Sequence, residues 1–129
     1  METIEQAYEA LRKYGLAFAD DRPWDMIKVE FNIYHKMVSA SQFLVFKGIK
    51  TDVGGFESES GWVWEGLDAV TYIRDYLFKL AGDRIWGLTF TLYPDGKFEI
   101  EYNYDKPEGY EETDEVITGE EINQTLLKW

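Results

Sequence analysis

Residues 86–105, which read WGLTFTLYPDGKFEIEYNYD, decide the fold class, because apolar and polar side chains alternate on both sides of a Pro-Asp-Gly turn. Alternation with a period of two is typical of a half-buried strand, and such a turn between two alternating runs indicates a β-hairpin. On the return strand, Glu99 and Glu101 share one face and lie about 7 Å apart by strand geometry. The strand is expected to end before Pro107, since proline cannot donate to a ladder.

An earlier segment has the same period. Residues 27–33 place an apolar side chain at every second position, which predicts another half-buried strand. Residues 42–47 are predicted to be its hairpin partner, with the turn at residues 39–41. The Gly- and Ser-rich segment 48–61 predicts a long loop, with at most a short third strand around residues 53–57.

Helical spacing occurs in three other places. Apolar residues recur every three or four positions over residues 4–18, and they do so again in a helix expected over about 64–81. Gly82 is a plausible residue after the end of this central helix, because helices often stop on a left-handed glycine. Thr118 and Glu121 fit a capping box, which predicts a short C-terminal helix.

These elements predict a single domain over residues 1–129 in the α+β class. We expect an antiparallel β-sheet built from two hairpins, packed with an N-terminal helix, a central helix and a short C-terminal helix. The 45% hydrophobic and 17% aromatic content excludes a disordered chain and supplies enough apolar side chains for one core.

Composition also bears on the compartment and on the classes of partner. The chain has no cysteine, its N-terminus lacks the pattern of a signal peptide, and no apolar run approaches the length that spans a bilayer. A cytoplasmic protein is therefore expected. The formal net charge of −12 disfavours nucleic acid and anionic membranes as direct partners, because both are negatively charged.

The acidic residues are concentrated late in the sequence, where ten carboxylates between residues 99 and 121 face one lysine. A strong local charge of one sign favours a partner of the opposite sign, and tyrosines among the acids suit guanidinium groups. We therefore predict a protein interface with a basic partner, although a solvated surface explains the charge about equally well. The residues predicted to contact the partner are Glu99, Glu101, Asp105, Glu108, Tyr110, Glu111, Glu112, Asp114, Glu115 and, as an aromatic anchor, Trp62.

Motifs for catalysis or cofactor binding are missing from the sequence. His35 is the single histidine and lies in no recognisable nucleophile motif, so a structural or exposed role is the better interpretation. The acidic run 105–115 lacks the spacing of a calcium-binding EF-hand loop, and no phosphate-binding glycine motif occurs. We expect no catalytic residue, no metal and no cofactor.

The hairpin at 86–105 resembles the YezG-like family of bacterial immunity proteins. The resemblance lies in the alternating aromatic and apolar strand, the turn ending in Gly-Lys-Phe, and the return strand ending in Tyr-Asp. It is carried by Trp86, Gly96, Lys97, Phe98, Tyr102, Tyr104 and Asp105. This resemblance implies an antitoxin that neutralises a toxin domain, often a nuclease, delivered between neighbouring bacteria in contact-dependent growth inhibition.

Two other classes of function remain open. A curved antiparallel sheet with helices on it can enclose an apolar cavity, so a small-ligand-binding domain or an enzyme of unknown substrate is the alternative. An adaptor that uses its acidic region for a different basic partner is the third possibility. The sequence does not indicate the oligomeric state.

Overall fold

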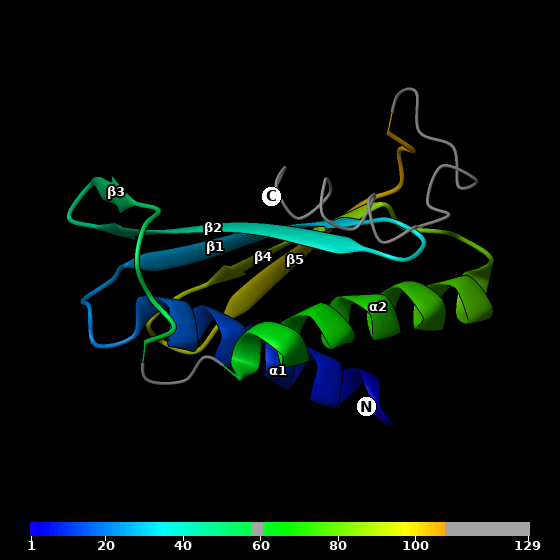
Figure 1. Ribbon diagram of the computed structural model, residues 1–129, viewed down its shortest axis with the longest axis horizontal. Coiled ribbons are helices and arrows are strands. Elements are labelled where there is room, and N and C mark those ends of the chain that lie inside the picture. The colour runs from blue at the N-terminus through cyan, green and yellow to red at the C-terminus, as the bar shows by residue number, and fades with distance from the viewer. Residues whose placement is uncertain (58–60, 108–129) are drawn as a thin grey trace, which may run out of the picture.

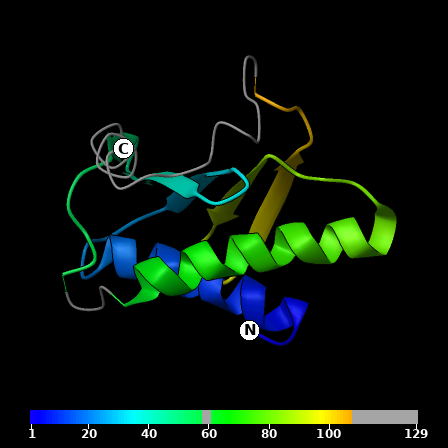
Figure 2. The same cartoon turned by 45° about the vertical axis from the view of Figure 1, so that its right-hand side comes forward.

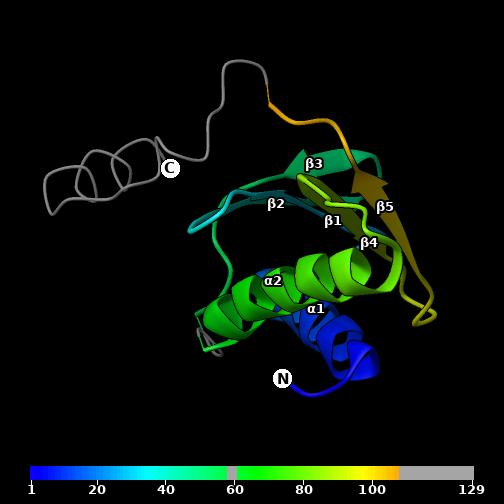
Figure 3. The same cartoon turned by 90° about the vertical axis from the view of Figure 1, so that its right-hand side faces the viewer.

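Two helices lie on one face of a five-stranded antiparallel sheet in the computed structural model, which describes residues 1–57 and 61–107 (Figure 1). Turning the molecule by 90° shows the two layers edge on, with both helices beneath the sheet (Figure 3). The elements in chain order are α1 (Ile4–Ala19), β1 (Met26–Ile33), β2 (Val38–Phe46), β3 (Ile49–Thr51), α2 (Trp62–Ala81), β4 (Gly87–Leu92) and β5 (Phe98–Asn103).

The α+β class and the antiparallel sheet are confirmed, and the order of the strands is β3-β2-β1-β4-β5. The two predicted hairpins correspond to β1–β2 and β4–β5, but β2 also pairs with β3, so the sheet is not built from two hairpins alone. They join because β1 also pairs antiparallel with β4, with Ile27 opposite Leu92 and Phe31 opposite Leu88. The third helix of the prediction, near the C-terminus, lies outside the described residues.

α1 begins where the sequence supplies a capping box. The Thr3 hydroxyl accepts a hydrogen bond from the Gln6 backbone N–H (3.1 Å), and the Gln6 side chain accepts one from the Thr3 N–H (3.3 Å). Gly15 does not end this helix, which continues to Ala19. A Cβ at Gly15 would meet only ordinary contacts, and the buried face of the helix runs through it.

α2 crosses α1 at close range, as the view turned by 45° shows (Figure 2). Gly66 makes this approach possible, because a Cβ at that position would lie 2.4 Å from a ring carbon of Tyr14. At the other end, Gly82 adopts the left-handed conformation (φ 75°) and donates its N–H to the Phe78 carbonyl, which confirms the predicted helix end.

The core lies between the sheet and the helices. Every second residue of β1 points toward the helices and is buried, and the same face of β4 supplies Leu88, Phe90 and Leu92. α1 contributes Leu11, Tyr14 and Phe18 to this core, and α2 contributes Val70 and Ile73. The alternation read from the sequence therefore records which face of each strand the helices cover.

The predicted turn at residues 39–41 is wrong. The chain reverses over Tyr34–Met37, where the Tyr34 N–H donates to the Met37 carbonyl (2.8 Å), and β2 starts at Val38. Ser39 and Ser41 pair with Asn32 and Glu30 on the face that neither α1 nor α2 covers, here called the uncovered face. Small polar residues usually favour a turn, but on an uncovered face they cost little, so the ladder continues through them.

The predicted third strand at 53–57 is also wrong, because β3 is Ile49–Thr51 and pairs with Leu44–Phe46. Gly54 and Gly55 have positive φ values of 76° and 90°, which breaks an extended conformation. The following loop folds over α1, where the Phe56 ring lies 5.1 Å from that of Tyr14 and the Phe56 N–H donates to the Ala17 carbonyl.

Candidate partner-binding surface

The face of the sheet opposite the helices is the surface on which the predicted strand carboxylates lie. Glu99 and Glu101 are exposed there, and Glu30 of β1 joins them. We call these three residues the acidic strip. Within the described part of the chain, none of the three carboxylates has an ion-pair or hydrogen-bond partner.

The register fixes the geometry of the acidic strip. Glu101 lies opposite Thr89, and Thr89 lies opposite Glu30, so these two carboxylates occupy one row across three strands. Two strand spacings separate them by about 10 Å. Glu99 stands in the next row, opposite Thr91, whose side chain is buried on this face at 6% exposure. The rigid ladder therefore holds three negative charges in a fixed pattern.

Lysines balance the acids toward the other edge of the sheet. Lys28 lies in the row of Glu99, two strands away, and Lys50 lies in β3 with its Nζ 4.3 Å from the centre of the Phe43 ring. The uncovered face thus changes from acidic at β5 to basic at β3. A partner that approaches the β5 side meets net negative charge.

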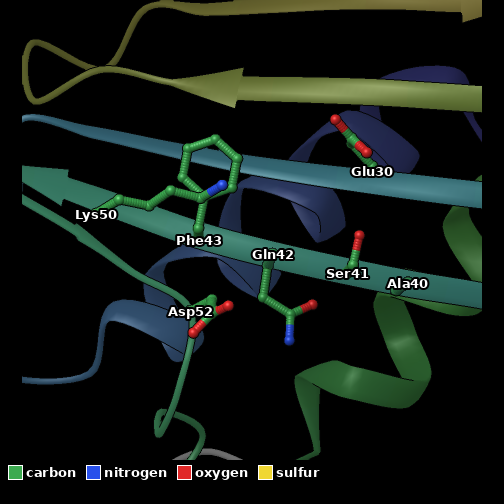
Figure 4. Close-up of a pocket in the computed structure, with 7 residues that line it drawn as sticks. All are labelled: Glu30, Ala40, Ser41, Gln42, Phe43, Lys50 and Asp52. Carbon is green, nitrogen blue, oxygen red and sulfur yellow. The ribbon is translucent and has the colours of Figure 1, made fainter.

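A groove of about 420 Å³ follows the part of β2 that β3 leaves unpaired (Figure 4). Glu30 and Ser41 line it on the uncovered face, while Gln42 and Asp52 lie on the other side of the β2 ribbon. Gln42 accepts a hydrogen bond from the Tyr14 hydroxyl (2.8 Å), which fixes its side chain. The lining is polar and carries charges of both signs.

Tyrosines pack beneath the acidic strip, on the helix side of β5. The hydroxyls of Tyr102 and Tyr8 are 3.4 Å apart, and the Tyr102 ring meets that of Tyr104 at 6.4 Å. Burial, and then the hydrogen bond to Tyr8, raise the pKa of Tyr102 above its usual range. Tyr102 therefore stays protonated near neutral pH, and Tyr104 is exposed at the end of the strand.

Of the other predicted site residues, Asp105 is exposed just after β5, and its N–H donates to the Asn103 side chain (3.0 Å). This places Asp105 at the end of the strand that carries Glu99 and Glu101. The remaining acidic residues and the tyrosine of the prediction lie outside the described residues; they are Glu108, Tyr110, Glu111, Glu112, Asp114 and Glu115.

Trp62 lies apart from the acidic strip, in the first turn of α2. The helix begins at Trp62, two residues earlier than predicted, and its turn directs the rings of Trp62 and Trp64 to different sides. Trp62 is half-buried, with Lys13 Nζ 4.9 Å from its ring centre, whereas Trp64 is 72% exposed. As an accessible aromatic on this helix, Trp64 fits the description of an anchor better.

A feature that the sequence analysis missed lies at the opposite end of α2. His35, Arg74 and Arg84 line a hollow of about 340 Å³ beside the exposed ring of Phe78. Arg74 donates to the Tyr34 carbonyl (2.8 Å), and the Arg84 guanidinium lies 3.5 Å from the centre of the Trp86 ring. His35 is exposed, and Asp75, which pairs with Arg74 at 3.0 Å, adds an acidic side chain to this lining.

In the ranges 1–57 and 61–107, no group of three or more His, Asp or Glu side chains is placed to hold a metal ion. None of the helices described is both long and apolar enough to cross a membrane. No protein-family model matches the chain, and a search of curated proteins finds no match.

Proposed function

We propose that this chain is an immunity protein, an antitoxin that binds a basic toxin domain of the nuclease type through an acidic surface and neutralises it. The observation that carries this proposal is the acidic strip, in which Glu30, Glu99 and Glu101 are held on adjacent rows of a rigid sheet without a described partner. The resemblance of the β4–β5 hairpin to the YezG-like family supports the same conclusion.

Electrostatics explains why such a surface suits this task. Unpaired carboxylates on one face steer a basic protein toward that face and raise the association rate, more so at low salt. A nuclease carries basic side chains where it holds its substrate, because the phosphate backbone supplies most of the binding energy. A protein that covers those side chains with carboxylates blocks the path of the nucleic acid and needs no catalysis of its own.

Inhibition is stoichiometric in this proposal, so slow release matters as much as fast capture. Exposed aromatic side chains beside the charges are the usual source of slow release. Tyr104 lies 52% exposed at the end of β5, next to Asp105. Together with the acidic residues of segment 108–115, these positions form the proposed interface, and the protein acts in the cytoplasm of the toxin-producing cell.

The test is co-expression with the toxin encoded next to the chain's own gene, scored by growth and by recovery of the complex. The double variant Glu99→Lys/Glu101→Lys is expected to lose protection, and reversal of Glu111, Glu112, Asp114 and Glu115 is expected to weaken binding further. Glu2→Lys/Glu5→Lys, just before and within the first turn of α1, is the matched control, because it changes the net charge of an exposed surface equally. If both reversals leave binding and its salt dependence unchanged, the acidic-surface proposal is wrong.

Binding of a small ligand is the second candidate, and the groove along β2 is the observation that favours it. Its polar lining of Glu30, Ser41, Lys50 and Asp52 suits a charged or hydroxyl-rich molecule better than an apolar one. A rise in melting temperature with a small metabolite, without any protein partner, supports this candidate. Ser41→Trp, which fills the groove, is expected to abolish such a rise and to leave toxin binding intact.

A further inference from the structure

The outer edge of β5 offers unpaired backbone groups to a partner. β5 is the last strand of the sheet, and within residues 1–57 and 61–107 no strand pairs with its outer side. An edge of this kind is a template on which another chain adds a strand through main-chain hydrogen bonds.

Two hydrogen bonds at its ends show which backbone groups of β5 face outward. The Tyr93 N–H donates to the Lys97 carbonyl (2.9 Å), and the Trp86 N–H donates to the Asn103 carbonyl (2.7 Å). Backbone groups alternate between the two sides of a strand, so the odd-numbered residues from 97 to 103 face β4. The N–H and C=O groups of the even-numbered residues therefore face outward, and they belong to Phe98, Ile100 and Tyr102.

Of the devices that usually protect an edge, β5 has only charged side chains. β3, at the opposite edge, is only three residues long and carries Lys50, both of which hinder strand addition. β5 is six residues long, contains neither proline nor lysine, and alternates Phe98, Ile100 and Tyr102 with glutamates. Among the described residues, a strand that is well suited to pairing is thus open on one side.

The two glutamates of β5 indicate which kind of strand can pair with its outer edge. If a second copy paired antiparallel with β5 as a continuous sheet, residues of the same face would stand opposite one another. Glu99 and Glu101 would then face the glutamates of the copy, and like charges directly opposite each other destabilise a pair. A strand with Lys or Arg at alternate positions would instead place its cations against both carboxylates.

We propose that the outer edge of β5 receives an extended basic segment of the partner protein as an additional strand. Every second residue of this segment is Lys or Arg and faces Glu99 and Glu101 on the uncovered side of the sheet. The residues between them are apolar or aromatic and pack beside Phe98 and Tyr102, of which Phe98 is 41% exposed. This inference rests on the proposed function, because it describes how the toxin is held.

The test uses the full chain and synthetic peptides rather than the toxin. An eight-residue peptide in which Lys alternates with Val and Thr is compared with a peptide of equal composition whose four lysines are adjacent. The alternating peptide is expected to bind about tenfold more tightly, since only its lysines share one face of a strand. In amide spectra, its binding is expected to shift and protect the N–H groups of Phe98, Ile100 and Tyr102.

Two variants separate the backbone contribution from the charge contribution. Ile100→Pro removes an outward N–H without removing a bond to β4, and Ile100→Ala is its matched control for the lost side chain. The proline variant is expected to bind the alternating peptide about tenfold more weakly than the alanine variant. Glu99→Lys/Glu101→Lys, which changes only exposed side chains, is expected to reverse the preference in favour of a peptide with alternating Glu.

Equal affinity for the two lysine peptides would overturn the inference, because charge alone would then account for binding. A doubled mass with protected β5 amides before any peptide is added would overturn it as well, since a second copy would occupy the edge. If the toxin binds while the peptides and Ile100→Pro have no effect, only this inference fails. If the alternating peptide binds but no toxin is neutralised, the proposed function fails and the strand-addition edge stands.

Discussion

Single residues set the distance between the layers of this protein. Tyr14 is 3% exposed, and its ring contacts those of Phe31 and Phe56 at 5.5 and 5.1 Å while its hydroxyl donates to Gln42. The absence of a side chain at Gly66 is what allows α2 to lie against this ring. Tyr14 of α1 thus packs against both α2 and the sheet.

Two glycine-to-alanine changes are expected to have opposite effects. Gly66→Ala should lower the free energy of unfolding by about 1–2 kcal/mol. The new methyl group clashes with the Tyr14 ring, and the cost of this overpacking exceeds the gain in helix propensity. Gly15→Ala should raise it by about 0.5–1 kcal/mol, because its methyl group meets Ile27 and Leu92 at ordinary distances of 3.5 and 3.7 Å. Urea unfolding of both variants checks this; the same sign for both would contradict the packing.

Stability should fall at alkaline pH because of Tyr14. Burial raises the pKa of Tyr14 to about 12, above its unfolded value of 10.0. The folded state therefore holds the Tyr14 proton more tightly than the unfolded state. The resulting contribution to the free energy of unfolding is complete below pH 10 and is lost as the pH rises toward 12. Its size is on the order of 2 kcal/mol.

Urea unfolding between pH 9 and 11.5 measures this loss, with Tyr14→Phe as the comparison. The variant should be less stable at neutral pH by about 1 kcal/mol, since Gln42 loses its donor. Its stability should then decline less steeply above pH 10. Tyr102, whose pKa is also raised, remains in both proteins, so parallel pH profiles would show that Tyr14 does not cause the decline.

At the scale of elements, an arginine outside any helix completes the end of α1. The last turn of α1 contains no basic residue, and Arg22 supplies the missing donors from the loop that follows. Its guanidinium donates to the carbonyls of Phe18 and Ala19 and to that of Val53, so it ties the loop after β3 to the helix. A helix end and a distant loop are therefore stabilised as one unit.

Replacing this arginine should cost stability in proportion to the donors lost. Arg22→Ala is expected to lower the free energy of unfolding by about 2 kcal/mol, and Arg22→Lys by about 1 kcal/mol, because an ammonium group cannot reach three carbonyls in the same fork. Hydrogen exchange at the Phe56 N–H, which bonds to Ala17, should speed up in both variants. Unchanged exchange at Phe56 would show that the loop is held by other contacts.

At the scale of the whole molecule, the charge is the dominant property. Twenty-five acidic residues against thirteen basic ones leave a formal net charge of −12, and the acidic strip keeps part of it uncompensated on rigid strands. Self-repulsion of this size destabilises the folded state while favouring a basic partner. The charge that weakens the isolated protein is thus the charge that the proposed function uses.

Salt is therefore expected to stabilise the free protein. Between 10 and 300 mM NaCl the free energy of unfolding should rise by about 1 kcal/mol, because screening shortens the range of the repulsion. Glu99→Gln/Glu101→Gln should show a smaller rise, whereas Gln6→Ala, which leaves the charge unchanged, should keep the full one. Stability that falls with salt would show that attractive ion pairs outweigh the repulsion.

Local patterns determined most of the elements of this fold. The glycine after α2 and the Pro-Asp-Gly turn are each made by residues close together in sequence, so the sequence alone predicts them. The capping box at Thr3 is equally local, but it was not predicted. The alternation along β1 and β5 likewise predicts which side of each strand faces the helices. The position of Glu99 and Glu101 on the uncovered face follows from this alternation.

The tertiary structure alone decided what is brought together across the sheet. Pairing of β1 with β4 places Glu30 in the row of Glu101, and pairing through Ser39 and Ser41 extends β2 where local propensity favours a turn. The same holds for the approach of Gly66 to Tyr14. Periodicity shows which side of a segment is buried. Which strands pair, and in which register, depends on contacts between residues distant in sequence, and no local pattern specifies those contacts.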